Sequence, residues 1–456
     1  MNTLIAITGL GIIVLILEIL NMRKGIVPFA VAGLVGVLAL IIAELDLFKS
    51  YYGNMVVISR YATTFSALFT ILTIFLVALS ADFYRNQQSK ISDFVSIKIF
   101  LLAGAVAMVS FGNLAMFFLG IEILSIALYI LAASDRLSLK SNEAGMKYFL
   151  MGSFASGIIL FGICLIYGAT GYFDVAEIHE LSKTEAIPAW YFIGITMMII
   201  GMLFKIAAVP FHFWAPDVYE GSPALTTATM STLAKVVAIA ALYKLLTSMN
   251  ASISNSLEVI IAAVSILSML LGNLMALRQQ NVKRMLAFSG IAHAGYMLMS
   301  ILALIYVPGI LLYYAAAYAL AGIAAFAVVL YVGREKGNED ISSFNGLGKS
   351  NPFLAAVLTG ALLSMGGIPI FSGFFGKFML FNQAIDGGYL AVVIVAVVSS
   401  IISIGYYFKL ILAMYTKEAA EDPKPTPFSY YAVGGLAILL NIIIGLFPSL
   451  VMDLLG

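Results

Sequence analysis

The sequence has few of the residues that a soluble protein needs on its surface. Only 10% of its 456 residues are charged, whereas 62% are hydrophobic, and the mean hydropathy is +1.05. A soluble domain carries about 25% charged residues, because polar side chains must cover most of what faces water. This composition excludes a water-soluble enzyme. It also excludes an intrinsically disordered chain, because disorder requires low hydrophobicity and high net charge.

Cysteine, histidine and an excess of one charge sign are also scarce. The single cysteine excludes an internal disulfide framework and a cysteine-ligated iron–sulfur centre. Three histidines make a metal cluster a poor expectation, and a net charge of +1 provides no basic surface for nucleic acid. Gly348-Lys349-Ser350 resembles the end of a phosphate-binding loop, but Ser343 stands where the first glycine is required. We therefore expect no metal, no bound cofactor and no nucleic-acid partner for this chain.

Long apolar runs dominate the sequence instead. About 20 predominantly apolar residues cross the hydrocarbon core of a bilayer. Barrel strands would alternate polar and apolar residues, and these runs do not. The sequence therefore predicts an all-α polytopic membrane protein embedded in the lipid bilayer. We expect about fourteen transmembrane helices, near 3–21, 26–45, 62–82, 94–111, 113–133, 146–168, 190–214, 224–248, 256–277, 285–306, 309–332, 353–381, 389–414 and 429–451.

Two further expectations concern the ends and loops of these spans. Residues 3–21 are expected to be an uncleaved first span, because no lysine or arginine precedes the apolar run. The mixed stretch 46–61 is expected to be a loop with room for a short interfacial helix.

The distribution of lysine and arginine predicts the orientation in the membrane. The even-numbered loops hold only Lys49, Arg60, Lys183 and Lys244. The odd-numbered loops hold many more: Arg23, Lys24, Arg85, Lys90, Lys98, Arg136, Lys140, Arg278, Lys283, Arg284, Arg334, Lys336, Lys349, Lys417 and Lys424. This bias places the odd loops in the cytoplasm and both termini on the outer, periplasmic side.

Two spans are interrupted by proline at corresponding places, near 205–210 and near 366–377. They are the seventh and the twelfth spans, an odd offset of five, so they cross the membrane in opposite senses. This pattern is typical of inverted-topology repeats with broken helices. We expect a single transmembrane domain over 1–456, made of three helices in 1–93, a first five-helix repeat at 94–248, an inverted second repeat at 256–414 and a C-terminal helix at 429–456.

Charged residues inside the spans are costly and mark ion pathways. Glu122 lies about midway through the fifth span and cannot reach either membrane surface. We expect it to meet a cation, a water molecule or a proton. The alternative is a structural ion pair that fixes helix packing.

Two lysines lie beside the helix breaks. Pro210 lacks an N–H group, so the carbonyl of residue 206, next to Lys205, loses its helical partner. Lys377 ends a stretch that contains four glycines and one proline. Both sites favour water and a proton acceptor in mid-membrane. The alternative for Lys205 is a lysine solvated at a helix end with an incidental kink. The alternative for Lys377 is a lysine that snorkels from a flexible helix end.

The remaining candidates are Lys235, Lys147 and His293. Lys235 lies mid-span with hydroxyl groups at 226, 227, 229, 231 and 232, which would either line a wet cavity or hold the lysine as a packing residue. Lys147 follows Glu143 by four residues, so a helical ion pair is its alternative. His293 can relay protons or take a hydrogen-bonded packing role. Burial disfavours the charged form of a lysine, and a nearby carboxylate favours it. A lysine that gains or loses contact with a carboxylate would therefore hold or release its proton.

Four stretches resemble the subunit N family of proton-pumping NADH–quinone oxidoreductase, respiratory complex I, which belongs to the antiporter-like membrane subunits. They are KYFLMGSFASGIILFGICLIYGATG (147–171), FKIAAVPFHFWAPDVYEGSPALTT (204–227), NVKRMLAFSGIAHAGYMLM (281–299) and SMGGIPIFSGFFGKF (364–378). The likeness runs in order over spans four to thirteen, and PDVYEG (216–221) is fairly specific for subunit N. One departure is SPALT (222–226), where a second proline is common in the family.

The resemblance implies a fold of fourteen helices with two inverted five-helix repeats and broken helices 7 and 12. It implies that the proton path uses the span-5 glutamate, the span-6 lysine, the broken-helix lysine, the central span-8 lysine and the span-12 lysine that faces the proton outlet, which are Glu122, Lys147, Lys205, Lys235 and Lys377.

The resemblance also implies a place in a larger assembly. This chain would hold no redox centre, while NADH, FMN, iron–sulfur clusters and quinone would be handled by other subunits in the inner (plasma) membrane. Other membrane-arm subunits and protons would be its partners. Two alternatives stay open: a subunit of a multisubunit cation/proton antiporter, which shares the broken helices and the span-5 glutamate, and a membrane scaffold without transport.

Overall fold

The computed structural model describes residues 1–85, 91–184, 187–249, 255–302, 307–418 and 426–455. Lys90, Glu185, Lys424 and the last residues of the tenth predicted span, 303–306, lie outside these ranges.

The described chain consists almost entirely of helices. Those of the first half are α1 (Asn2–Ile19), α2 (Ile26–Ala43), α3 (Arg60–Phe83), α4 (Ile91–Ser110), α5 (Leu114–Ala132), α6 (Leu139–Thr170), α7 (Val175–Thr184), α8 (Ala189–Lys205), α9 (Trp214–Gly221), α10 (Ala224–Thr229) and α11 (Lys235–Ser248). Those of the second half are α12 (Asn255–Leu277), α13 (Val282–Leu302), α14 (Pro308–Lys336), α15 (Leu347–Ser350), α16 (Pro352–Gly366), α17 (Ser372–Asp386), α18 (Leu390–Thr416), α19 (Phe428–Leu446) and α20 (Ser449–Met452). Single 3₁₀ turns lie at Arg23–Gly25 and Ile341–Phe344.

Twelve of the described helical segments are long and apolar enough to cross a membrane, and α8 and α16 are shorter apolar helices. These two short helices are the first halves of the spans predicted at 190–214 and 353–381. Together the fourteen segments match the fourteen predicted spans, so the prediction of an all-α multi-pass membrane protein with broken helices 7 and 12 is confirmed.

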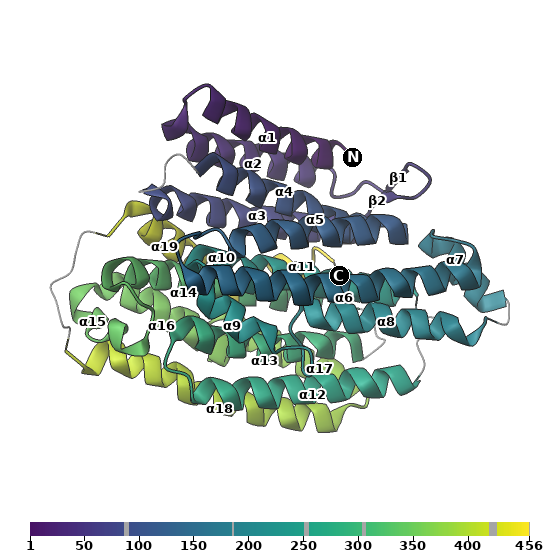
Figure 1. The fold of residues 1–456 in the computed structure, drawn as a ribbon. Helices are drawn as coiled ribbons and strands as arrows, with labels where there is room; N and C mark the ends of the chain where they lie inside the picture. The colour runs from purple at the N-terminus through teal and green to yellow at the C-terminus, as the bar shows by residue number, and fades with distance from the viewer. Residues whose placement is uncertain (86–90, 185–186, 250–254, 303–306, 419–425, 456) are drawn as a thin grey trace.

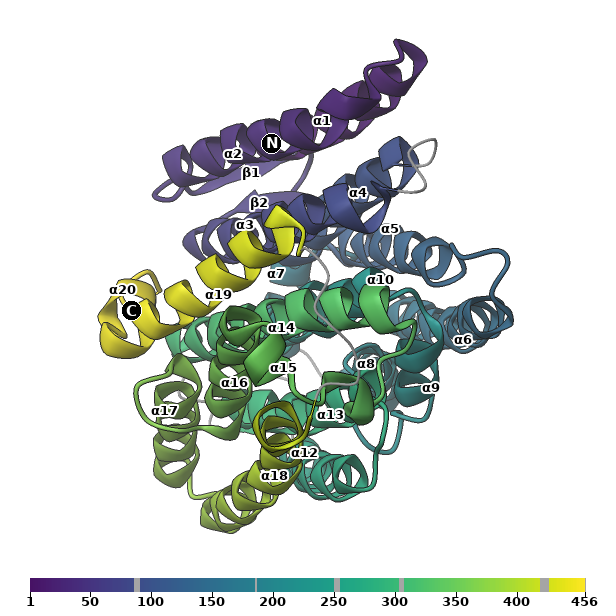
Figure 2. The ribbon, with the colours of Figure 1, turned by 90° about the vertical axis from the view of Figure 1, so that its left-hand side faces the viewer.

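The long helices lie side by side with roughly parallel axes (Figure 1). Helices α1 and α2 form an outer layer over α3 and α4, and α12 and α18 lie on the opposite side of the molecule (Figure 2). In the most apolar 18-residue stretch of α13, of α14 and of the α10–α11 segment, every residue is buried. In the corresponding stretches of α1 and α2, only 28% and 33% of the residues are buried. Helices α13 and α14 therefore lie at the centre of the molecule, surrounded by the other helices.

Each broken span contains a non-helical segment between two helices. Helix α8 ends at Lys205, and the chain passes through Ala207, at a φ of 58°, before α9 begins. Helix α16 ends at Gly366, and Gly367 follows in the left-handed region at a φ of 84°. Glycine is also required at Gly373, because an added Cβ would collide with the backbone carbonyl of Ser364.

The stretch predicted to hold a short interfacial helix is instead a β-hairpin. Strand β1 (Lys49–Tyr51) pairs antiparallel with β2 (Val56–Ile58), and Val56 also bridges to Phe111 after α4. The stretch 46–61 was expected to be a loop with room for a short interfacial helix, and the hairpin stands in place of that helix, with β-branched residues after a Gly-Asn turn. The two turn residues, Gly53 and Asn54, both take positive φ values.

Both termini lie at one face of the molecule. Thr3 donates a hydrogen bond of 2.7 Å to Glu44, which joins the start of α1 to the end of α2. Arg60, at the start of α3, lies 3.4 Å from the carbonyl of Asp453. Because α2, the hairpin and α3 follow one another in the chain, this face carries the beginning and the end of the sequence.

Candidate functional site

The side chain of Lys205 turns from the end of α8 toward α5 and α6. Its amine donates hydrogen bonds to Ser125 Oγ at 2.8 Å and Ser156 Oγ at 3.1 Å, and it lies 3.4 Å from Tyr129 Oη. Lys205 does stand at a helix end, as its alternative supposed, but hydroxyl groups from two neighbouring helices hold the amine.

Glu122 lies one helical turn before Ser125 on the same face of α5. Within the described part of the chain, its carboxylate makes no ion pair within 4.0 Å, and its buried Oε1 has no hydrogen-bond partner. The alternative of a structural ion pair therefore fails among these residues. A buried acceptor without a protein partner is a place for water or for a proton.

Lys235 is buried, with 2% of its surface exposed. It directly follows a π-helical turn over Met230–Ala234, a distortion that is frequent at functional sites. Its amine has no hydrogen-bond partner among the described residues.

The hydroxyl groups that were expected to hold Lys235 are bonded elsewhere. Four donate to backbone carbonyls, namely Thr226, Thr227, Thr229 and Thr232. Ser231 Oγ lies 3.3 Å from Tyr318 Oη. The alternative of a packing lysine held by these hydroxyls is wrong, because Thr229 and Thr232 donate to the backbone of their own helix, whereas Thr226 and Thr227 donate to carbonyls of α5 and α9.

Lys377 turns back from α17 into the break of the twelfth span. Its amine donates to the carbonyls of Met365 at 2.9 Å and Gly366 at 3.2 Å, and to Ser400 Oγ at 2.8 Å. It also lies 4.8 Å from the centre of the Tyr296 ring. The two carbonyls belong to the last turn of α16, where helical partners are missing and a cation is favoured. With 4% of its surface exposed, Lys377 does not reach a membrane surface, so that alternative is wrong.

His293 lies on α13 with both ring nitrogens next to hydroxyl groups. Nδ1 is 2.7 Å from Tyr314 Oη, and Nε2 is 3.3 Å from Tyr407 Oη. The ring is buried, and it faces three tyrosine rings, of Tyr296, Tyr314 and Tyr318. This geometry suits both of the roles that were left open for the histidine.

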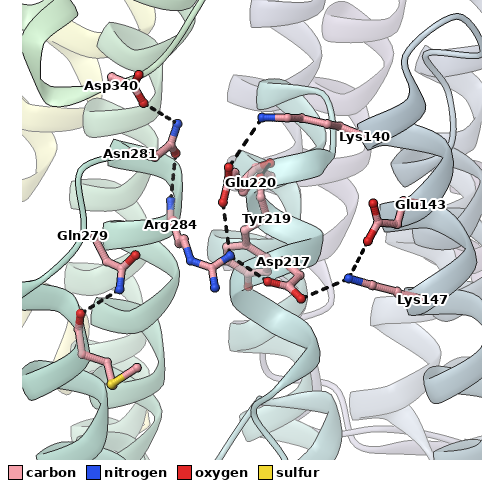
Figure 3. A network of polar contacts seen from close by, with 12 residues as sticks. Lys140, Glu143, Lys147, Asp217, Tyr219, Glu220, Gln279, Asn281, Arg284 and Asp340 are labelled. Carbon is pink, nitrogen blue, oxygen red and sulfur yellow. Dashed lines mark hydrogen bonds and ion pairs between the residues drawn. The ribbon is translucent and has the colours of Figure 1, made fainter.

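Lys147 lies apart from these buried groups, in an ion-pair network that Figure 3 shows. Its amine is 2.6 Å from Glu143 Oε1 and 3.2 Å from Asp217 Oδ2, and its side chain is 41% exposed. Arg284 continues the network to Asp217 at 2.7 Å and to Glu220 at 3.1 Å. The helical ion pair expected as the alternative for Lys147 is present, and the structure does not bring Lys147 to the buried lysines.

The network shifts the titration of Asp217, which lies on α9 outside the transmembrane spans. Partial burial raises the pKa of this carboxyl, but hydrogen bonds from Arg284 and Lys147 outweigh burial and hold the pKa below its ordinary value. Asp217 is therefore an anion at neutral pH and links α6 to α13.

A polar cavity of about 540 Å³ opens beside this network. Loops after α5, α9, α12 and α14 meet around it, and Lys140, Glu220, Lys283 and Glu339 are among the residues that line it. Lys283 is 4% exposed, lies 3.4 Å from Glu339 and donates to the carbonyl of Ser222 at 3.0 Å. Lys283 was predicted to be a loop charge, so its burial was missed.

Lys98 and Lys244 were also counted with loops, and the structure corrects both. Lys98 lies inside α4, is 1% exposed, donates to Ser80 Oγ at 3.2 Å and lies 4.9 Å from the Tyr84 ring centre. Lys244 donates to the carbonyls of Val109 and Phe111 at the end of α4, at 2.8 Å and 2.6 Å. Both lysines already stood inside predicted spans, 94–111 and 224–248, and were counted with the nearest loop because they lie near the span ends.

The comparisons with known proteins place the chain in a family. The family model described as "NADH:quinone oxidoreductase/Mrp antiporter, TM" matches residues 112–403. A NADH-quinone oxidoreductase subunit N from Flavobacterium johnsoniae is 70% identical over 100% of both chains.

Two solved structures share the fold. A chain of respiratory complex I from Thermus thermophilus matches with a TM-score of 0.85 and 28% identity, covering 99% of this chain and 98% of that one. A chain of the Mrp complex from Dietzia sp. DQ12-45-1b matches with a TM-score of 0.83 and 20% identity, covering 99% and 94%. The chain, with its two broken helices and its buried lysines, belongs to the NADH-quinone oxidoreductase subunit N family, within the wider family of NADH:quinone oxidoreductase/Mrp antiporter membrane subunits.

Proposed function

We propose that this chain is a proton-translocating subunit in the membrane arm of NADH–quinone oxidoreductase. Protons move along a row of buried side chains made of Glu122, Lys205, Lys235 and Lys377. The observation that carries the proposal is that each lysine of the row meets a helix interruption. Lys205 ends α8, Lys235 follows the π-helical turn, and the amine of Lys377 bonds to the end of α16. Interrupted helices in mid-membrane are typical of transport sites.

The chemistry of the first half of the row suits reversible protonation of Lys205. Its partners Ser125, Ser156 and Tyr129 are hydroxyl groups, which accept hydrogen bonds from an ammonium and donate to a neutral amine. Glu122, on the same face of α5 as Ser125, favours the charged lysine when it is ionised. A change in the charge of Glu122 therefore changes how firmly Lys205 holds its proton.

The wider assignment follows from the family. NADH, FMN, iron–sulfur clusters and quinone act in partner subunits, and this chain contributes the translocase part of the enzyme without a redox centre of its own. Other membrane-arm subunits are its partners. In that assembly Lys147 and His293 also belong to the proton path, and Lys147 takes its place through the ion-pair network at the side of α6.

We place the chain in the cell (plasma) membrane with both termini on the periplasmic side. The lysine and arginine bias supports this orientation, and the position of both termini at one face is consistent with an even number of spans. The polar cavity beside Lys283 lies at the face with the odd loops, so it gives protons access from the cytoplasm.

The arrangement of two inverted repeats, 94–248 and 256–414, is also part of the proposal. Corresponding helix pairs pack in both halves: α4 with α5 as α12 with α13, and α6 with α8 as α14 with α16. Lys244, near the end of α11, bonds to carbonyls at the end of α4. Because α12 begins soon after α11 at that face, α4 and α12 run in opposite senses, as inverted repeats require.

The experiment that tests the proposed function is Lys205→Ala in the complete complex, reconstituted in liposomes. We expect proton pumping to fall strongly while the complex still assembles, because the substitution removes a proton acceptor without touching the assembly's surface. Lys183→Ala, at an exposed lysine paired only with Glu180 in the described part of the chain, is the matched control. An assembled Lys205→Ala complex that pumps normally would contradict the assignment.

A second measurement separates the proposed function from a cation/proton antiporter. We expect flavin and iron–sulfur proteins to co-purify with the native chain. If they are absent and the purified assembly exchanges sodium for protons, the antiporter function is the correct one.

A further inference from the structure

The indole of Trp214 fixes the two sides of the break in the seventh span to each other. Its Nε1 donates a hydrogen bond of 3.1 Å to the carbonyl of Phe204, the residue before Lys205. The ring stacks on Tyr148 of α6, with ring centres 4.6 Å apart, and on Phe204 of α8, at 5.5 Å. Trp214 is 3% exposed. The first residue of α9 is therefore held on the last turn of α8 by a hydrogen bond and on α6 by a ring contact.

The helix ends at the two breaks have the same backbone turn but different residues in it. Both α8 and α16 end in a Schellman motif, in which two N–H groups that follow the helix donate back to carbonyls of its last turn. Ala207 takes the left-handed conformation after α8, and Gly367 takes it after α16. A Cβ disfavours this conformation and glycine adopts it freely. The turn at Ala207 is therefore the less favourable of the two, and the hydrogen bond from Trp214 supports it.

The two breaks also differ in the side chain that bonds to the helix end. At the end of α16, the amine of Lys377 donates to the last two carbonyls of the helix. At the end of α8, the donor is the indole of Trp214, and the amine of Lys205 donates instead to hydroxyls of α5 and α6. A lysine in the last turn of a helix can bond to the end carbonyls. An uncharged indole N–H at one of these carbonyls leaves the amine for other partners.

The ring contacts of Trp214 continue to the amine of Lys205. Tyr148 meets Tyr129 of α5 edge to face, with ring centres 4.9 Å apart. The Tyr129 hydroxyl lies 3.4 Å from the amine of Lys205, and the centre of its ring lies 5.8 Å from that amine. A displaced indole would therefore disturb both the backbone that carries Lys205 and one side of the site that receives its amine.

We propose that Trp214 is a positioning residue for Lys205. Its N–H holds the end of α8 in place, so that the amine of Lys205 stays between the hydroxyls of Ser125 and Ser156. Trp214 itself carries no proton. The inference rests on the proposed function, because the position of the amine matters only if Lys205 takes up and releases protons.

The test compares two substitutions of Trp214 in the complete complex reconstituted in liposomes. Trp214→Phe keeps a ring against Tyr148 and removes the N–H. Trp214→His keeps an N–H on a five-membered ring and loses much of the stacking surface. We expect Trp214→Phe to lower the ratio of protons pumped to quinone reduced by roughly twofold or more, because the loss of one uncharged hydrogen bond shifts an equilibrium by that factor. Trp214→His should retain more of the ratio. A role in packing alone predicts the reverse order.

Trp190→Phe is the matched control. Trp190 is the other tryptophan of the chain and lies 48% exposed at the start of α8, so this variant should pump at the normal ratio. The ratio is measured in assembled complex, because a purely structural defect lowers the amount of complex and leaves its ratio unchanged.

A double variant tests whether Trp214 acts through Lys205. Ser156→Ala weakens the hydroxyl site in which Trp214 is inferred to keep the amine. Combined with Trp214→Phe, it should therefore lose less than the product of the two single losses, because substitutions that act on one site are not independent. Losses that multiply would show two independent effects and would contradict the positioning role.

Three other results would overturn the inference: an unchanged ratio in Trp214→Phe, an equal loss in Trp190→Phe, or a lower ratio in Trp214→His than in Trp214→Phe. If neither variant of Trp214 assembles, the residue serves the fold and the inference also fails. If Lys205→Ala loses pumping while Trp214→Phe pumps normally, the positioning role fails and the proposed function stands. If Lys205→Ala also pumps normally, the proposed function itself fails.

Discussion

At the scale of single residues, the partners of each buried amine differ in what they can do. Lys205 faces hydroxyl groups, and Lys377 faces two backbone carbonyls and one hydroxyl. A carbonyl can only accept, whereas a hydroxyl can do both. The first site therefore accommodates a charged or a neutral amine with little rearrangement, and the second favours the ammonium.

Removing one hydroxyl from the Lys205 site should weaken its function without breaking the fold. We expect Ser156→Ala to slow proton pumping, because the ammonium loses a 3.1 Å hydrogen bond that contributes about 1.5–3 kcal/mol for a charged donor. Pumping by the reconstituted complex is the measurement. Ser153→Ala, at an exposed position of the same helix, is the control and should pump normally. Equal pumping by Ser156→Ala and the wild type would show that this hydroxyl is not needed.

Asp217 predicts an acid-dependent loss of stability. Its pKa is lowered in the folded protein, so its ionised form stabilises the fold at pH values above the unfolded pKa of about 3.9, and this contribution is lost as the pH falls through the lower folded value. We expect Asp217→Asn to be less stable than the wild type at pH 7 and to lose less stability on acidification. Thermal unfolding of the purified complex at several pH values measures this. Parallel pH profiles for the two proteins would contradict it.

At the scale of helices, the breaks were foreseeable and the side-chain partners were not. Proline and clustered glycines interrupt long apolar runs, so the broken spans and the lysines beside them follow from the sequence. The hydroxyls that hold Lys205 come from helices 80 and 49 residues away in the chain, and no pattern in one helix indicates which face meets them. Tyr314 and Tyr407 were missed for the same reason, because tyrosines in apolar runs resemble ordinary packing residues.

The close approach of α17 to α16 gives a test at this scale. We expect Gly373→Ala to destabilise the protein by about 1–3 kcal/mol, which is the range for inserting an extra methyl group into a packed interior, because the new Cβ would meet the carbonyl of Ser364. Gly168→Ala on α6 is the control, since nothing lies within 4 Å of the added methyl group. Thermal unfolding of both variants decides the matter: a Gly373→Ala protein as stable as Gly168→Ala would mean that the two helices can separate at little cost.

At the scale of the whole molecule, the constraints of the bilayer allow the architecture to be predicted from the sequence. Apolar runs of about 20 residues predict the number of spans, and the loop charges predict their direction. Lys98 and Lys244 were counted with loops, but both are bound within the bundle. The hairpin at 49–58 was not foreseen, because loops of this length have no periodic pattern long enough to separate a strand from a short helix.

The proposed orientation can be measured with single cysteines. In a Cys164→Ser background, we expect Asp453→Cys to react with a membrane-impermeant maleimide added to cells with a permeable outer membrane, because the proposed orientation puts the C-terminus on the periplasmic side. Lys140→Cys should react only after the inner membrane is opened, because Lys140 lines the cavity that this orientation puts on the cytoplasmic side. The reverse pattern of labelling would invert the orientation.

The cap that Lys377 places on α16 couples charge to backbone position. A lysine ammonium has three N–H bonds and a neutral amine has two, while three acceptors surround it: the carbonyls of Met365 and Gly366 and the hydroxyl of Ser400. When the proton leaves, at least one of these acceptors loses its donor. Since Ser400 already donates to Gly366, that carbonyl keeps a donor when the amine loses one N–H bond. Deprotonation of Lys377 would therefore remove one of the three hydrogen bonds that tie α17 to the end of α16 and to Ser400.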